Sequence, residues 1–323
     1  MAGAQAQGHA RRGVAGVSPG ALFLPLGAAF GYACGAIGIK RALGVGASAA
    51  WVNFLSNAIM AILFQFLWLM PGKSHDPYLL LAPALCGLLF FLGQILTFRA
   101  IATGDVSVAT PLLGAKVVLV ALFTLILLGK PLPLAWWLAS LLASAGIALI
   151  SYMPGASVRH VRETVLCSMG AAAIYAITDV LVQKWVPLVG YGTFAAVMFG
   201  SMGILSLVYV PGFLRLASLG IDRSSASSFW LPGCPRIAFP WLLAGALLLA
   251  VQSLGMYSAI GLYGSAAMTN ILYGSRCLWS VLLVWACGYL TLEGSLRQSR
   301  SNVMRRRLIG ALLLFGAMAL VLC

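Results

Sequence analysis

Long apolar stretches follow one another along almost the whole chain. A membrane-spanning α-helix needs roughly 20 predominantly apolar residues. Ten stretches meet this requirement, and the short breaks between them carry glycine, proline or charged residues. The stretches cover residues 21–39, 48–70, 78–99, 106–129, 133–152, 165–186, 191–213, 240–262, 266–290 and 307–323. The pattern predicts an all-α integral membrane protein with ten transmembrane helices.

The composition agrees with this prediction. Hydrophobic residues make up 62% of the 323 residues and charged residues only 8%, whereas a soluble domain is about 25% charged. The net charge of +14 does not point to nucleic acid, because most of the cations lie in the breaks between the apolar stretches. Cations in such breaks anchor helix ends to lipid headgroups.

The first residues differ from the rest of the chain. Residues 1–19 form a small, polar tail with Arg11 and Arg12 before the first apolar stretch. Such a tail could be the start of a signal peptide. The stretch that follows is long and glycine-rich and ends in no clear cleavage site, so we interpret it as an uncleaved first helix.

The two halves of the chain contain similar sequences in the same order. The pattern Gly-Ala-Ala-x-x-Tyr-Ala occurs at 27–33 and again at 170–176. The third and eighth stretches contain Gln94 and Gln252, and segment 110–116 in the fourth matches 270–276 in the ninth. This order predicts two five-helix repeats, residues 20–155 and 156–323.

Five helices per repeat have a geometric consequence. An odd number of spans makes the second repeat enter the membrane from the opposite side to the first. The repeats are then related by a pseudo-two-fold axis in the membrane plane, as in many secondary transporters. We therefore expect a solute site at their interface, near the middle of the bilayer. Gly27, Gly31 and Gly35 form a stripe of small residues in the first helix, which favours close helix packing or a sliding surface.

Four segments carry a resemblance to a known family. They are Ala-Thr-Pro-Leu-Leu-Gly at 109–114, Leu-Leu-Gly-Lys-Pro-Leu at 127–132, Gly-Ile-Ala-Leu at 146–149 and the glycine-containing segment 308–316. The chain resembles the drug/metabolite transporter superfamily, specifically its EamA-like members. The resemblance implies ten helices formed from two five-helix repeats and transport of a small molecule. Lys130 stands where family members usually carry glutamate.

Two cations lie near the middle of predicted spans, at matching positions of the repeats. Lys116 lies in the fourth span and Arg276 in the ninth. Charged groups inside a membrane are costly and normally face a cavity or a partner. An inverted two-fold axis would bring both toward one central cavity, where they would attract a carboxylate or a phosphate. Alternatively, one or both reach the membrane surface, or pair with Asp179 for structure alone.

Asp179 in the sixth span has no acidic counterpart in the first repeat, where Ala36 occupies the matching position. Burial raises the pKa of a carboxylate, which would suit a proton-coupling group. The preferred interpretation is a fixed counter-ion to Arg276 or Lys184.

Several polar or amphipathic residues complete the candidate site. They could bridge helices by hydrogen bonds or bind substrate, and the symmetric tyrosine and glutamine pairs are the better candidates for binding. The set comprises Tyr32, Tyr175, Gln94, Gln252, Tyr257, Tyr273 and Asn270.

The sequence contains no signature of an enzyme. No complete P-loop, dinucleotide-binding motif or Gly-x-Ser-x-Gly elbow is present. His9, His75 and His160 lie outside the spans and near no pair of carboxylates, so we predict no metal site and no cofactor.

Charge and resemblance disagree on orientation. Most flanking cations lie on the side of the membrane opposite the N-terminus, which favours an external N-terminus. The family resemblance implies that both termini are cytoplasmic.

Together these observations predict a secondary transporter of the cell (inner) membrane, surrounded by lipid, with a small-molecule substrate that carries a carboxylate or phosphate. Alternating access would be a rocking of the two repeats, driven by a proton or an exchanged metabolite. The alternatives are an exporter of neutral or cationic compounds and a non-transporting membrane scaffold subunit.

Overall fold

The computed structural model describes residues 18–70, 77–103, 106–151, 161–218, 229–231, 234–287 and 301–322. Most of the predicted tail 1–19 and the predicted repeat boundary at 155/156 lie outside these residues. The helices are α1 (Pro19–Gly44), α2 (Ala49–Gln65), the 3-10 helix η1 (Phe66–Leu69), α3 (Pro77–Thr103), α4 (Val106–Gly114), α5 (Lys116–Leu128), α6 (Leu134–Ser151), α7 (Val161–Val189), α8 (Tyr191–Ser218), α9 (Phe239–Tyr263), α10 (Ala266–Tyr273), α11 (Arg276–Cys287) and α12 (Ser301–Leu322). A short antiparallel hairpin, β1 (Phe229–Leu231) and β2 (Cys234–Pro235), precedes α9.

The outer surface of this bundle is apolar. Phe23, Leu81 and Val208 are 71%, 67% and 74% exposed. Many other large apolar side chains are also exposed, which would be unfavourable in water over so large an area. Within the described ranges, eight helices are long and apolar enough to cross a membrane. The protein is therefore a multi-pass integral membrane protein.

Two of the ten predicted spans are not among those eight. The ninth stretch is divided into α10 and α11, of 8 and 12 residues, neither long enough to cross the membrane alone. The last helix, α12, carries the basic residues 305–307 near its start. The fourth stretch is also divided, at Ala115 between α4 and α5.

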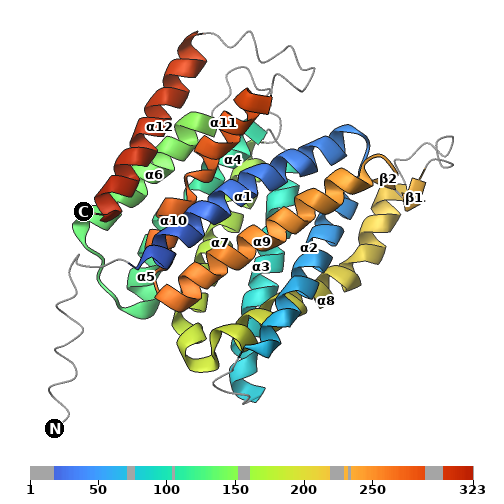
Figure 1. Ribbon diagram of the computed structural model, residues 1–323, viewed down its shortest axis with the longest axis horizontal. Coiled ribbons are helices and arrows are strands. Elements are labelled where there is room, and N and C mark those ends of the chain that lie inside the picture. Colours follow the sequence, from blue (N-terminus) through green and yellow to red (C-terminus); the bar gives the residue numbers. More distant parts are fainter. Residues whose placement is uncertain are drawn as a thin grey trace.

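The helices pack in pairs that join the two halves of the chain. Figure 1 shows α1 lying along α9, and α6 lying along α12 at the edge of the molecule. In the same way α3 packs along α7, and α2 along α8. Each pair combines one helix from before residue 155 with one from after it.

Small residues allow two of these pairs to approach at backbone distance. A Cβ atom on Gly245 of α9 would lie 2.9 Å from the backbone nitrogen of Ile39 and 3.0 Å from the carbonyl oxygen of Gly35. A Cβ atom on Gly146 of α6 would lie 2.8 Å from the carbonyl oxygen of Gly310 in α12. Close backbone approach of this kind is how helices associate where no hydrophobic force acts between them.

The observed glycine stripe begins one glycine later than predicted. Gly31 and Gly35 face α9, and so does Gly38, but a Cβ atom on Gly27 would meet nothing within 4 Å. The stripe therefore begins at Gly31, because the contact with α9 follows the crossing point of the two helices.

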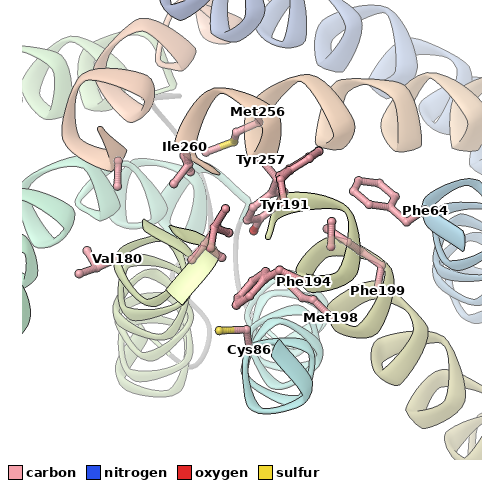
Figure 2. Packing of buried hydrophobic residues seen from close by; sticks show 14 of the residues in the cluster. Phe64, Cys86, Val180, Tyr191, Phe194, Met198, Phe199, Met256, Tyr257 and Ile260 are labelled. Atoms are coloured by element: carbon pink, nitrogen blue, oxygen red, sulfur yellow. The ribbon is translucent and has the colours of Figure 1, made fainter. Parts of the chain in front are cut away.

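Aromatic side chains fill the space between α2, α3, α8 and α9. The rings of Phe64 and Phe199 lie 3.9 Å apart, and the ring of Tyr257 lies 5.3 Å from that of Phe199. Figure 2 shows these residues together with Phe194, Met198 and Cys86 in one continuous cluster. Tyr257 lies at the edge of this core, where its hydroxyl reaches the polar groups described below.

Gly245→Ala tests the backbone contact between α1 and α9. The added methyl group would displace one helix from the other, and overpacking typically costs about 1–3 kcal/mol. We expect a lower midpoint of thermal unfolding in detergent. Gly27→Ala is the matched control, since its methyl group meets open space and alanine favours a helix. Equal midpoints for the two variants would contradict the close contact.

Candidate functional site

The two cations predicted to lie at matching positions occupy matching places in the structure. Lys116 is the first residue of α5 and Arg276 the first residue of α11. At each break the backbone tightens: the nitrogen of Ala115 donates to the oxygen of Leu112, and that of Ser275 to Leu272, both at 3.1 Å. A glycine, Gly114 or Gly274, precedes each cation by two residues, and glycine lowers the stability of a continuous helix.

Asp179 of α7 forms an ion pair with Lys116. The distance from Lys116 Nζ to Asp179 Oδ2 is 2.8 Å, and the Asp179 side chain is fully buried. Arg276 or Lys184 was the preferred counter-ion for Asp179, and a pairing of Lys116 or Arg276 with Asp179 was the alternative given for the two cations. The carboxylate contacts Lys116, on the neighbouring broken span.

Two further side chains donate hydrogen bonds to the same carboxylate. Asn270 Nδ2 in α10 donates to Oδ2 at 2.7 Å, and the Tyr257 hydroxyl in α9 donates to Oδ1 at 3.5 Å. Asn270 also donates to the carbonyl oxygen of Ala266. Asp179 thus connects α5, α7, α9 and α10 at one point, and both of its carboxylate oxygens have a protein partner.

Arg276 has a different environment. Its guanidinium carbon lies 5.0 Å from the ring centre of Tyr32 in α1 and 4.7 Å from that of Tyr273 in α10. Cations are attracted to aromatic faces at such distances. Within the described part of the chain, no carboxylate forms an ion pair with Arg276. The positive charge of Arg276 is therefore stabilised by rings but not neutralised.

The tyrosine predicted to match Tyr32 takes the corresponding place beside the other cation. Lys116 Nζ lies 5.7 Å from the ring centre of Tyr175 in α7. Tyr175 is held by a 3.5 Å hydrogen bond from Thr97, and its ring packs beside Phe90. Each cation therefore faces a tyrosine on the first helix of the other half of the chain.

Gln252 and Gln94 do not share an environment. The Tyr273 hydroxyl donates to Gln252 Oε1 at 2.8 Å, which fixes Tyr273 beside Arg276. Gln94 instead exchanges two 2.9 Å hydrogen bonds with Asn57 of α2. Asn57 is fully buried and also donates to Ser206 of α8. Gln94 therefore belongs to a second polar cluster between α2, α3 and α8.

Several residues of these clusters were absent from the predicted site. Asn57 and Ser206 join the second cluster, and Gln183 accepts a 2.9 Å hydrogen bond from the backbone nitrogen of Ala266 at the start of α10. The polar pair Asn53 and Asn57, spaced by four residues within an apolar stretch, is the signal that could have found the second cluster.

The space between the two cations is nearly closed. A cavity of about 10 Å³ is lined by Lys116, Arg276, Asn270 and Tyr273 together with neighbouring residues of both broken spans. That volume holds about one water molecule. A larger hollow of about 470 Å³ lies near the Arg99–Glu163 ion pair, but it includes none of the predicted site residues. Among the described residues no group of three potential metal ligands occurs.

Comparison with known proteins agrees with the fold and, in the first half of the chain, with three of the four segments that carried the resemblance. One solved structure, described only as "Crystal structure of protein", covers 93% of this chain and 96% of its own length, with 17% identity and a TM-score of 0.67. It shows that the fold is shared. No curated protein sequence matches the chain. Residues 18–152 match the model of the EamA-like transporter family. The predicted resemblance is thereby confirmed over residues 18–152, which match the EamA-like transporter family and are consistent with the drug/metabolite transporter superfamily.

Proposed function

We propose that this protein is a secondary transporter that binds a small metabolite through a carboxylate or phosphate group at Arg276. The observation that carries the proposal is the uncompensated charge of Arg276. It lies at the start of α11 beside two tyrosine rings, with no carboxylate partner in the described ranges. The start of a half-helix inside the membrane favours an anionic substrate group, because the helix dipole is positive there.

A cationic substrate is less compatible with this arrangement. Asp179, the anion of this cluster, is fully buried and already engaged by Lys116 and Asn270. A cation would have to displace Lys116 to reach the carboxylate. An anion can approach Arg276 without breaking an ion pair.

We further propose that the chain consists of two inverted five-helix repeats, residues 20–155 and 156–323. The helix pairs support this. If each helix is replaced by its counterpart in the other repeat, the α1–α9 pair becomes the α7–α3 pair, which is also observed. The α2–α8 and α6–α12 pairs each join a helix to its own counterpart. The breaks before Lys116 and Arg276 support it as well. So do the two cation–tyrosine contacts, each of which crosses from one repeat to the other.

The size of the cavity supports alternating access. A space for about one water cannot hold a metabolite, so the site must widen toward one side of the membrane to load. The breaks at Ala115 and at Gly274–Ser275 lie beside the cations and would allow each half-helix to tilt separately. A proton or an exchanged metabolite would drive the cycle in the cell (inner) membrane.

Arg276→Met tests the anion site. We expect reconstituted vesicles to lose uptake of labelled carboxylates or phosphates by about 10- to 100-fold, because charge-assisted hydrogen bonds contribute about 1.5–3 kcal/mol. Arg276→Lys should retain part of the uptake, since it keeps the charge but not the planar fork. If Arg276→Met takes up all the labelled carboxylates and phosphates as the parent does, the proposal is wrong.

The two glutamines provide a matched pair of variants. Gln252→Leu removes the acceptor that holds Tyr273 beside Arg276, so we expect anion uptake to fall about two- to tenfold. Gln94→Leu should change anion uptake less, because its partner is Asn57. It should instead lower thermal stability by about 1 kcal/mol, the scale of hydrogen bonds between membrane helices. The opposite ranking in the uptake assay would place the substrate beside Gln94.

A further inference from the structure

The charges around the central cavity do not cancel. Lys116 and Asp179 form a 2.8 Å ion pair and neutralise each other. Arg276 lines the same cavity and has no carboxylate partner among the described residues. One positive charge therefore remains.

We propose that Asp179 sets the charge of the substrate, so that the site selects organic anions with a single negative charge. This inference rests on the proposed anion site at Arg276 and narrows its substrate class. A monoanion at Arg276 brings the cavity to neutrality. Asp179 is thus a specificity-determining residue that need not touch the substrate.

A dianion fits this charge balance poorly. Its second charge would remain uncompensated in a region where water is scarce and charge–charge interactions are strong. It could reach Lys116 only by displacing Asp179, which would leave a fully buried carboxylate held by Asn270 and Tyr257 alone. Leaving one member of a buried ion pair without its partner is strongly unfavourable.

The same reasoning separates chemical classes of substrate. A phosphate monoester carries about 1.5 to 2 negative charges at neutral pH, so it resembles a dicarboxylate in this respect. A monocarboxylate or a phosphodiester carries one. The expected substrate is therefore a monocarboxylate or a phosphodiester.

Neutralising substitutions of the ion pair test the inference, because they change the net charge of the cavity in known steps. Asp179→Asn keeps the side-chain shape and raises the charge from +1 to +2. Lys116→Met lowers it to zero. The double variant Lys116→Met/Asp179→Asn restores +1 without the ion pair. The same purified full-length protein in detergent serves for every variant.

The probes are matched anions that differ in charge but little in shape. They are succinamate with succinate, the half-amide of adipate with adipate, and the methyl diester of glycerol 3-phosphate with glycerol 3-phosphate. Each is titrated against the thermal unfolding of the protein, since a ligand that binds the folded state stabilises it. The readout is the ratio of the half-effect concentrations of monoanion and dianion.

We expect the parent to prefer the monoanion of at least one pair. Asp179→Asn should shift the ratio toward the dianion by about tenfold or more, because one added charge acts across a few ångströms at low dielectric. Lys116→Met should weaken binding of both probes, and the double variant should recover the preference for the monoanion. If Asp179→Asn does not fold, the comparison of the parent, Lys116→Met and the double variant carries the test.

Several results would overturn the inference. They are a parent stabilised by dianions in preference to monoanions or by neither, an unchanged ratio in Asp179→Asn, and a double variant that binds no better than Lys116→Met. Arg276→Met in the same assay distinguishes a failure of the proposed anion site from a failure of the proposed role of Asp179. If it binds the anions as the parent does, the anion site itself is wrong. If it loses them while Asp179→Asn keeps the parental ratio, only the role of Asp179 is wrong.

Discussion

A carboxylate with no access to water, inside an apolar helix bundle, constrains everything around it. The Asp179 side chain is fully buried, and an ionised carboxylate in such a place must be paired and hydrogen-bonded. Lys116 supplies the charge, and Asn270 and Tyr257 supply hydrogen bonds. These partners come from three different helices besides that of Asp179. The central packing of the bundle is therefore organised around one charge, and the breaks in two spans lie next to it.

The helix breaks and the two central cations lie at the same places for a physical reason. A continuous helix satisfies its backbone groups internally, but a break leaves some of them open in the membrane, where that is costly. The breaks at Ala115 and at Gly274–Ser275 lie inside the protein, adjacent to Lys116 and Arg276. Irregular backbone at this depth is tolerated where it lines a cavity, and the small cavity between the cations meets that condition.

The sequence was sufficient for the apolar stretches, for the matching positions of Lys116 and Arg276 in two spans, and for the family resemblance over residues 18–152. A run of about 20 apolar residues has few alternatives to a helix in a membrane. The sequence was not sufficient for the helix breaks, because a continuous helix and an interrupted one can have the same apolar pattern. The recurring Gly-x-cation at 114–116 and 274–276 is a local hint of them.

The sequence left the partners of the polar residues open. Asp179 pairs with Lys116 rather than with Arg276 or Lys184, because the rotation of α7 against α5 decides which cation it reaches. Gln94 and Gln252 match in sequence but differ in neighbours. In each case the deciding quantity is how two helices are turned toward each other, and side-chain spacing along one helix does not encode it.

The glycine contacts limit which helices can move relative to each other. α1 and α9 meet at backbone distance through Gly35 and Gly245, as do α6 and α12 through Gly146 and Gly310. Helices packed at backbone distance leave little space to slide past each other, so we expect each pair to move together. Since each pair combines one helix from the first half of the chain with one from the second, a movement that keeps these contacts would differ from the expected rocking of one repeat against the other. It would move groups of helices drawn from both halves.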